Sequence, residues 1–501
     1  MFNKMKNKGM LLVCSLSVFI ISVCFINFLE RQNCMNVPII SEEQLNEYTE
    51  TTSLDISLMS FEGEKIAVDF PGNSIYISQS SGNLKHFYTL QGKLEPTSPE
   101  YSLYFLDTPA LNDISESVKE NEPLTLIIRC GDTYQRVNVV ITTLPVLYLD
   151  FDGSCEDEQG RTLNNGKFTL WNSLNSSNSY KTVTSLAEWR MRGNSTTIYP
   201  KLSWKLNLRT DNGENNDLDL LNLGSDDDWI LNPMSMDDTK LKERMSQELW
   251  NQLGSQTDHN YQMSKGEYVE VLINGAYQGL YMLQRRVDAK YLNLDQEEDI
   301  LMKGINTWEA ETVSDGYEIV STPFGDEETY IYLEKTLDFQ DGNRINTDNF
   351  IDVNLLLQFL SGVDNYGYKN MFYALVKTNE TYEMYLVPWD TDLSLGVTWG
   401  YDYEESLNEI VERQELGTVR EHVSDIDEQI AKRWQELRKS IYSEENIFSI
   451  YDSITAELTV CGVIERDQNR WGLLHEEEDT WENLQLFIKE RLMFLDEYYM
   501  Q

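Results

Sequence analysis

The feature that most constrains this chain is an uncharged, largely apolar run from Met10 to Leu29. A helix of this length spans about 30 Å, close to the thickness of the hydrocarbon core of a bilayer. Three lysines precede the run, at Lys4, Lys6 and Lys8. The positive-inside rule therefore predicts a basic cytosolic tail at residues 1–9, a transmembrane signal-anchor at residues 10–29 and an extracytoplasmic location for the rest. This is the topology of a single-pass protein of the cell membrane.

Two other readings of this segment stay open. A cleaved signal peptide is one, although its apolar core would be unusually long and no small-x-small cleavage site follows. Lipidation is the other, but Cys14 and Cys24 each follow a valine, where a lipoprotein signal needs a small residue. A retained anchor is the interpretation that these observations favour.

Charge and cysteine usage restrict the possible partners. The formal net charge of −44 argues against binding nucleic acid through its phosphates. The cysteines after the apolar run are too scattered for a disulfide framework, although one Cys130–Cys155 bridge is possible. Apolar and aromatic content is ordinary for a globular protein, and the chain is long enough for two or three domains with real cores.

The organisation after the apolar run starts with a polar tether at residues 30–50. Short apolar or alternating stretches, separated by Gly, Asn, Asp and Pro, then predict strands. They start at Ile75, Tyr101, Leu124 and Val137. Strands at this spacing predict a small Ig-like β-sandwich over residues 51–144, with the role of a spacer or docking module.

Residues 145–501 predict a mixed α+β domain that becomes helical from about residue 416. Asn274-Gly275 lies between two strand-like stretches, and this dipeptide is the strongest short hairpin signal. A helix is expected before it, because Leu241, Met245 and Leu249 recur at four-residue spacing.

A cation-rich stretch from Arg190 to Arg209 is the first candidate for chemistry. It contains no acidic residue in a chain that is otherwise strongly acidic. Such a concentration of cations suggests a bound polyanion, with phosphate groups the usual case. The alternative is a strand whose outer face pairs with acidic neighbours. Trp204 and Leu206 alternate with Lys205, which predicts that Lys205 projects from a strand into a cleft.

A set of carboxylates follows in a suggestive order. A helical run leads into the loop from Asp364 to Asn370, a hairpin follows, and its exit carries Asp390 and Asp392. Helix, Asp-to-Asn loop, hairpin and Asp is the order of the catalytic parts in protein kinases. The spacing from Asp364 to Asn370 is one residue longer than in those enzymes, and no Gly-x-Gly-x-x-Gly loop occurs. A capping Asp and a solvated Asp-x-Asp turn would explain the same residues without chemistry.

Together these stretches resemble the signature of the CotH family, the spore coat protein H-like atypical protein kinases. The matching motifs occur in the family's order over roughly residues 146 to 497. They are Arg192-Gly-Asn-Ser-Thr with Pro200-Lys-Leu-Ser-Trp-Lys-Leu, Asp226-Asp-Asp-Trp229 with Asp237-Asp-Thr-Lys-Leu-Lys242, Glu270 to Tyr281, Asp364 to Asn370, Pro388 to Gly396 and Arg466 to Trp471. The resemblance implies a two-lobed, kinase-like domain that phosphorylates Ser or Thr of cell-surface or spore-coat proteins. It implies ATP as co-substrate and Mg²⁺ or Mn²⁺ as cofactor.

The resemblance also implies a role for individual residues. Asp364 would orient the acceptor hydroxyl or take its proton. The metal ligands would be Asn370, Asp390 and Asp392. The nucleotide would be bound by Lys205, or by Lys201 as the alternative lysine, with Arg192 and Asn194 beside it. Glu243, or Glu248 on the same helix, would pair with that lysine.

The sequence departs from the family pattern at two places. Gln284-Arg285 stands where the family usually has Glu, and Lys242-Glu243 stands where its helix normally carries Arg-Asn. These departures motivate a second hypothesis, a surface or coat interaction module that keeps the fold but does little chemistry. The Asp364, Asn370 and Asp390 set is intact, which favours the kinase.

Overall fold

The computed structural model describes residues 35, 37–85, 87–157, 160–172, 181–193, 198–256, 261–305, 312–365, 367, 369–396, 403–475 and 478–500. The predicted transmembrane segment at residues 10–29 lies outside these residues, and so do residues 30–34 of the predicted tether. In the described part, no single helix is long and apolar enough to cross a membrane. One bent helix pair, Glu444–Thr459 with Val463–Trp471 at an angle of 72°, has the length and composition of a membrane span when its two helices are taken together.

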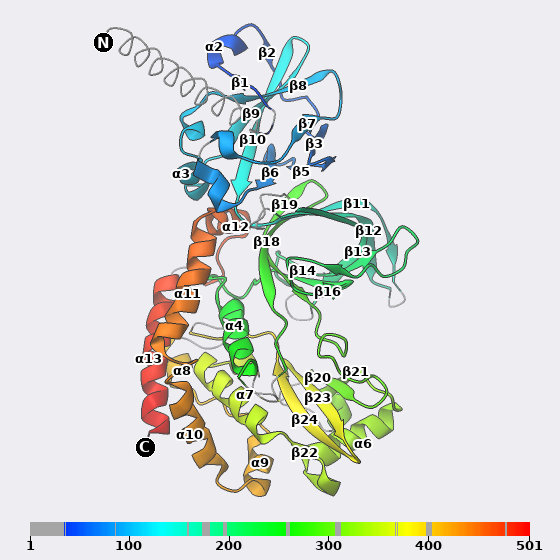
Figure 1. Cartoon of the computed structure of the whole chain (residues 1–501), viewed down its shortest axis with the longest axis vertical. Helices are drawn as coiled ribbons and strands as arrows, with labels where there is room; N and C mark the ends of the chain where they lie inside the picture. The colour runs from blue at the N-terminus through cyan, green and yellow to red at the C-terminus, as the bar shows by residue number, and fades with distance from the viewer. Residues whose placement is uncertain are drawn as a thin grey trace, which may run out of the picture.

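The N-terminal unit is built on two sheets (Figure 1). The larger, seven-stranded sheet has the order β1-β8-β9-β10-β6-β5, with β2 pairing β10, and the smaller has the order β4-β3-β7. The elements are β1 (Ile39–Ile40), α2 (Glu42–Leu45), β2 (Thr49–Glu50), β3 (Met59–Phe61), β4 (Glu64–Lys65), β5 (Ala67–Asp69), β6 (Ser74–Ser78), β7 (Leu94–Pro96), β8 (Tyr101–Leu106), α3 (Ile114–Lys119), β9 (Leu124–Cys130) and β10 (Thr133–Thr142).

The strands predicted near Ile75, Tyr101, Leu124 and Val137 are present as β6, β8, β9 and β10. Three pairs in the larger sheet are parallel, namely β1 with β8, β2 with β10 and β6 with β10. These pairs distinguish it from the all-antiparallel sheets of the sandwich that the sequence predicts. Parallel partners are remote in sequence, so turn signals cannot reveal them. Cys130 and Cys155 are free thiols, so the bridge considered from the sequence is absent.

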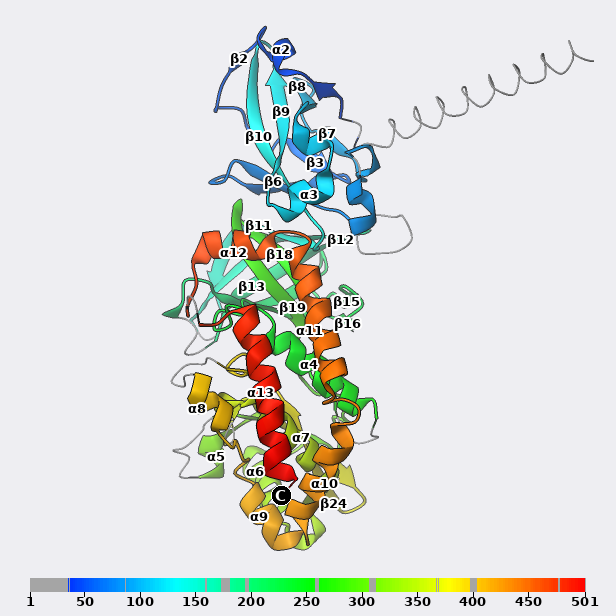
Figure 2. The same cartoon turned by 90° about the vertical axis from the view of Figure 1, so that its left-hand side faces the viewer.

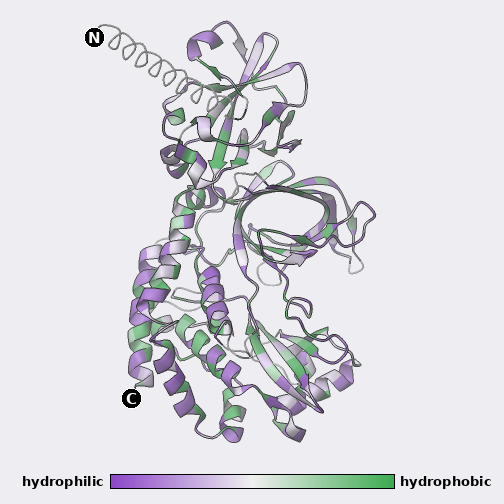
Figure 3. Ribbon diagram, in the orientation of Figure 1, coloured by the Kyte–Doolittle hydropathy of each residue, from purple (hydrophilic) through white to green (hydrophobic). Residues whose placement is uncertain are grey.

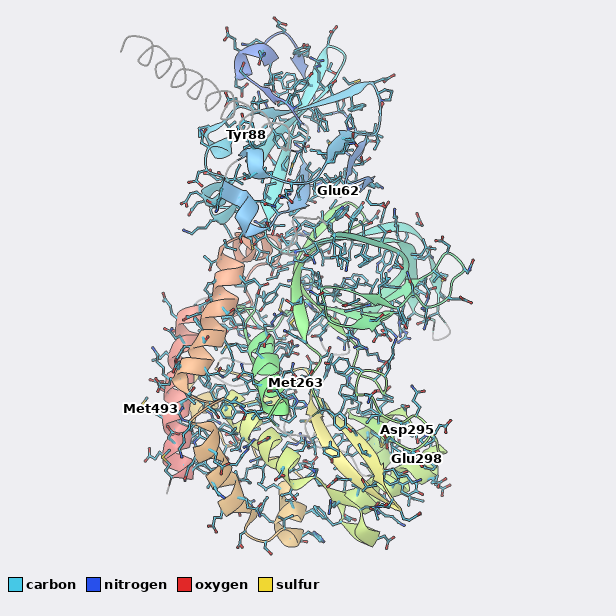
Figure 4. The ribbon with its side chains drawn as sticks, viewed as in Figure 1. Glu62, Tyr88, Met263, Asp295, Glu298 and Met493 are labelled. Atoms are coloured by element: carbon cyan, nitrogen blue, oxygen red, sulfur yellow. The ribbon has the colours of Figure 1, made fainter. Side chains whose placement is uncertain are left out.

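A closed seven-stranded barrel follows directly, with the order β11-β12-β13-β14-β17-β19-β18. Its strands are β11 (Val146–Glu156), β12 (Thr162–Asn172), β13 (Lys181–Arg192), β14 (Ser203–Arg209), β17 (Asp228–Asn232), β18 (Gly266–Ile273) and β19 (Ala276–Arg285), and a small hairpin, β15 (Leu218–Asp219) and β16 (Ser225–Asp226), lies between β14 and β17. Parallel pairing of β11 with β18 closes it. Side chains fill its interior (Figure 4), where Trp189, Leu206 and Trp229 belong to one apolar cluster.

The hairpin and the helix predicted around residues 237–285 are confirmed. Asn274 and Gly275 both have positive φ, 49° and 73°, as the two-residue turn between β18 and β19 requires. The predicted helix is α4 (Lys242–Gly254), and Leu241, Met245 and Leu249 are fully buried.

A five-stranded sheet lies below the barrel, with the order β21-β20-β23-β24-β22 (Figure 1). Its elements and their neighbours are β20 (Ile300–Gly304), α5 (Val313–Gly316), β21 (Tyr317–Ser321), α6 (Asp326–Leu337), β22 (Arg344–Ile345), α7 (Thr347–Leu360), β23 (Met371–Thr378) and β24 (Thr381–Pro388). The predicted hairpin over Met371 to Val387 is β23 with β24. We call this sheet the lower sheet.

The remainder is helical, as predicted, and the α+β class is confirmed. The helices are α8 (Tyr403–Asn408), α9 (Leu416–His422), α10 (Ile426–Leu437), α11 (Glu444–Thr459), α12 (Val463–Trp471) and α13 (Trp481–Tyr499). Figure 2 shows α11 and α13 running lengthwise along the molecule, and Figure 3 shows apolar and hydrophilic residues interspersed along both. Part of their apolar residues face inward, because Leu458 on α11 and Leu495 on α13 are fully buried.

Candidate active site

The cation-rich stretch forms two neighbouring strands of the barrel wall. Arg190 on β13 is directly opposite Lys205 on β14, so both side chains lie on the same face of the sheet. The adjacent residues Trp189 and Leu206 point to the other face and fill the barrel interior. The alternation read from the sequence therefore holds, and Lys205 projects outward from the barrel.

This outer face borders a cleft of about 230 Å³ between the barrel and the lower sheet. Cations line it from both sides: Arg190, Arg192, Lys205, Arg286 and Lys303. Its carboxylates are Asp228 and Glu318, and its apolar wall consists of Ile230, Val287, Val320, Phe372 and Trp389. In a chain with a net charge of −44, this local excess of positive charge favours an anion as the ligand of the cleft.

The cations of the cleft are only partly neutralised by the protein. Lys205 pairs with Asp228 at 2.9 Å, and Arg286 shares the same carboxylate at 3.3 Å. Within the described residues, Arg192 and Lys303 form no ion pair. Burial lowers the pKa of both, although Asp390 opposes this. Two half-buried cations without a counter-ion favour a bound anion at this position.

The loop from Asp364 to Asn370 begins after α7, where Val363–Asn365 forms a short 3-10 helix. Lys369 Nζ lies 2.7 and 2.8 Å from the two carboxylate oxygens of Asp364. The amide nitrogen of Asn370 donates to the same carboxylate at 2.7 Å. Because this nitrogen faces Asp364, the amide oxygen of Asn370 is the atom that can face a cation.

A buried asparagine joins this loop to the end of β24. The side-chain nitrogen of Asn365 donates to the backbone oxygens of Asn370 and Trp389 at 3.0 and 2.9 Å. The Trp389 N–H in turn donates to the Asn370 oxygen at 3.1 Å. The loop and the Asp390–Asp392 turn, which we call the acidic turn, therefore lie side by side.

The acidic turn is fixed from the helix side by Glu243. A carboxylate oxygen of Glu243 accepts the Thr391 N–H at 2.6 Å and the Thr391 hydroxyl at 2.9 Å. Asp390 adopts a left-handed conformation, with φ of 55°, which Asp tolerates better than most residues. The position and direction of the turn are thus set by α4 as well as by β24.

Negative charge accumulates around this turn. The pKa of Asp392 lies well above its usual range, because the group is buried and because other carboxylates surround it: Asp390, Glu243, Asp237 and Asp364. Burial, and then Asp390, also raise the pKa of Glu243 to about 7. No cation is among the main influences on Asp392 and Glu243, whereas Asp364 is paired with Lys369. A metal ion next to Asp392 and Glu243 would be stabilised by their charge.

The donor set suits a hard divalent cation. Carboxylate and amide oxygens are the ligands of Mg²⁺, which usually takes one or two carboxylates and completes its shell with waters and phosphates. Elsewhere in the described part of the chain, three acidic side chains have ligand atoms within 4.8 Å of one another. They are Asp217, Asp226 and Asp227. Arg285 and Lys290 already neutralise that trio. Among the described residues, Asp390 and Asp392 are not part of such a trio, so an ion held there would need further ligands from phosphates and water.

Three predicted residues do not make the contacts that were expected of them. Lys201 is buried and pairs with Asp467 at 2.7 Å instead of facing the cleft. Glu243 contacts Thr391 instead of a lysine, and Glu248 lies near Arg244 and Lys265. Asn194 lies outside the described residues.

Several residues of the site were not assigned roles from the sequence. Lys369 lies inside the Asp364–Asn370 motif, so its position next to Asp364 was available as a signal. Arg286 and Lys303 lie on segments with no cationic cluster, and only the fold brings them to the cleft. Arg413 is also new: it is buried, pairs with Glu415 at 2.8 Å and donates to the Asn365 carbonyl, which supports the loop from below.

The molecule therefore belongs to the class of α+β proteins in which a cation-lined cleft opens beside a cluster of carboxylates. The sequence model of the family described as "CotH kinase protein" matches residues 189–495, more than half of the chain, and the chain belongs to this family. It is also 26% identical over 259 residues to the inner spore coat protein H of Bacillus subtilis (strain 168), a match that covers 45% of this chain and 67% of that protein.

Proposed function

We propose that the chain is an atypical protein kinase that transfers the γ-phosphate of ATP to Ser or Thr of other proteins. In this proposal the barrel and the lower sheet with its helices act as the two lobes. The observation that carries it is the juxtaposition of a cation-lined cleft with an acidic turn, because a metal–nucleotide complex needs both kinds of charge side by side.

The cleft supplies contacts for each part of the nucleotide. Lys205, Arg192 and Lys303 would bind phosphate oxygens, and the two without ion pairs would give up no counter-ion, only a long hydrogen bond from Arg192 to Ser203 and contacts with the rings of Trp389 and Phe372. The apolar wall around Ile230, Phe372 and Trp389 suits the flat face of a base. Asp228, the carboxylate that Lys205 and Arg286 share, reduces the net positive charge of the cleft to a value that a triphosphate can match.

Transfer requires one bond to form and one to break. The acceptor hydroxyl oxygen attacks the γ-phosphorus, the bond from that phosphorus to the β,γ-bridging oxygen breaks, and ADP leaves. Asp364 orients the hydroxyl and accepts its proton, for which a carboxylate oxygen has to be released from Lys369. Lys369, once released from Asp364, would be available to interact with the transferred phosphoryl group.

Asn370, Asp390 and Asp392 are the residues that would hold Mg²⁺ or Mn²⁺. When bound, such an ion neutralises phosphate charge and fixes the phosphates relative to the acceptor. Asp392 contributes best when ionised, and a nearby cation lowers the pKa of a carboxylate that its neighbours have raised.

The acceptor is proposed from the relatives. The similarity to an inner spore coat protein supports a substrate among coat or cell-surface proteins. A membrane anchor at residues 10–29 would place the site outside the cytosol. Activity there requires ATP in that compartment, such as the space around a forming spore.

Phosphotransfer by purified residues 35–501 tests the proposal. We expect labelled phosphate from ATP to be incorporated into the protein itself or into a Ser-rich acceptor when Mg²⁺ or Mn²⁺ is present. Asp390→Asn and Asp364→Asn should each reduce incorporation by at least about 100-fold, the scale at which catalytic groups act. Asp217→Asn is the matched control, because it removes one carboxylate from the other acidic group and should leave activity unchanged.

Full activity in Asp390→Asn would overturn the site. Stabilisation by Mg-ATP without any transfer would show nucleotide binding without catalysis. If Mg-ATP causes no thermal stabilisation at millimolar concentration, the kinase is rejected in favour of the alternative, a non-catalytic surface or coat interaction module that retains the fold, since a ligand that binds the folded state must raise its apparent stability.

A further inference from the structure

Glu243 is a buried carboxylate at the start of α4, and the hydrogen bonds that it accepts from the described residues all come from neutral groups. It accepts the N–H and the hydroxyl of Thr391, and it accepts from the Gln247 side chain at 3.2 Å. Only 1% of its surface is exposed. No cation is among the main influences on its charge, and its strongest charged neighbour is Asp390.

The orientation of Glu243 is fixed through Gln247 by the barrel. The Gln247 side-chain nitrogen donates to Glu243 and, at 3.1 Å, to the side-chain oxygen of Gln284 on β19. Its oxygen accepts the N–H of Gly266 on β18 at 2.9 Å. Gln284 is directly opposite Ile230, a residue of the cleft wall. A continuous chain of hydrogen bonds thus runs from the barrel to the acidic turn.

A glutamine at position 243 would keep the two bonds from Thr391 but would lose the bond from Gln247, because its NH2 group would replace the oxygen that accepts it. The oxygen of a glutamine at position 243 can accept both bonds from Thr391, so those bonds alone do not explain a carboxylate. What the carboxylate adds is a negative charge directly behind Asp390 and Asp392. In the protein without metal this charge is unfavourable, because it is buried and repelled by Asp390.

We infer that Glu243 is a positioning residue for a divalent cation, which orients the acidic turn through Thr391 and strengthens cation binding there by its charge. The inference rests on the proposed metal site of the kinase. Groups behind the ligands of a metal commonly act in this way, and their removal typically lowers metal affinity by about 10- to 100-fold. An unfavourable charge in the free protein becomes favourable once the cation is bound.

This role predicts opposite effects on the free and the metal-bound protein. Glu243→Gln should raise the melting temperature of the full-length protein in EDTA by about 2 °C, because a repelled charge is removed. The same variant should bind Mn²⁺ at least about tenfold more weakly in the presence of ADP, measured by calorimetry and by Mn²⁺-dependent thermal stabilisation. A merely structural role would lower the melting temperature and leave the metal affinity unchanged. The measurements belong at pH 8, above the pKa of about 7 of Glu243.

Glu248→Gln is the matched control, since it makes the same change on the same helix but at a residue near Arg244 and Lys265. It should leave Mn²⁺ affinity unchanged. Asp390→Asn tests the metal site itself. If Asp390→Asn abolishes Mn²⁺ binding while Glu243→Gln binds it normally, the inference is rejected and the proposed site stands. If the unchanged protein shows no Mn²⁺ response, the metal site and the inference are both rejected.

Discussion

Lys201 and Lys205 belong to the same cation-rich run, and the sequence offered both as nucleotide-binding lysines. The structure separates them. Lys205 lies on β14 with its side chain on the outer face of the barrel, whereas Lys201 precedes the strand and turns inward to Asp467, 266 positions away. The alternation of apolar and polar residues predicts the face of the sheet to which a strand side chain points, but it gives no information on a partner so remote in the chain. This is why one assignment could be made from the sequence and the other could not.

Removal of the two lysines should therefore have different consequences. Lys201→Met leaves the buried Asp467 without its closest cation and should cost about 3 kcal/mol or more of stability. Lys205→Met removes a partly buried pair whose carboxylate, Asp228, keeps Arg286 as a partner, so it should cost about 1 kcal/mol, while it weakens Mg-ATP binding. Urea unfolding and nucleotide titration of both variants measure this contrast. Equal stability losses would contradict it.

Glu243 should also make stability depend on pH in metal-free buffer. Its pKa is about 7 in the folded protein against 4.5 for an ordinary Glu, so the folded state binds the proton more tightly. Its contribution to stability is complete below about pH 4.5 and is lost as the pH rises to 7, with a total of about 3 kcal/mol. We expect stability in EDTA to fall between pH 5 and 7 and Glu243→Gln to flatten this fall. Asp392, whose pKa is raised too, should leave a residual slope.

At the scale of elements, local patterns predicted more than long-range ones. The hairpin at Asn274-Gly275 and the helix with Leu241, Met245 and Leu249 were both predictable, because turn residues and apolar periodicity act within one element. The closure of the barrel was not predictable, since it depends on the parallel pairing of β11 with β18, which are more than a hundred residues apart in the chain. The same limit applied to the acidic turn: its aspartates were visible in the sequence, but the contact of Thr391 with α4 was not.

The docking of α12 on β19 shows why a motif near the C-terminus belongs with the barrel. Asp467 on α12 accepts the Leu280 N–H at 2.9 Å, and Arg466 pairs with the buried Glu270. Gly279 permits the close approach: its φ is +94°, and a Cβ there would lie 2.1 Å from an Asp467 oxygen. The Arg466–Trp471 segment is thus a structural contact of the barrel hairpin.

Gly279→Ala should consequently destabilise the protein through both backbone strain and displacement of α12. We expect a loss of about 2 kcal/mol or more, seen as a lower urea midpoint. Gly131→Ala is a suitable control, because Gly131 also has positive φ, +58°, but has nothing within 4 Å of an added Cβ. A similar loss in the two variants would show that strain alone is responsible and that the contact with Asp467 contributes nothing.

At the scale of the whole molecule, the N-terminal unit and the barrel share one apolar core. Tyr76 stacks on Tyr277 of β19 with ring centroids 4.8 Å apart, and both belong to one buried cluster that extends into the C-terminal helices. The Phe70 N–H donates to Gly275, and Asp69 accepts the Tyr277 N–H. The predicted spacer is therefore packed against the hairpin that leads, through Gln284 and Gln247, to the acidic turn.

Shared packing of this kind predicts cooperative unfolding. Residues 35–501 should give a single calorimetric transition, because separate melting of the N-terminal unit would expose Tyr277 and the Glu270–Arg466 pair, which are now buried. A chain that starts at residue 145 should melt several degrees lower and, if it stays folded, should bind Mn²⁺ with ADP more weakly. The milder change Asp69→Ala removes one contact and should shift the transition in the same direction by a smaller amount. Two separate transitions in residues 35–501, with an unchanged melting temperature for the shortened chain, would show instead that the N-terminal unit is an independent spacer.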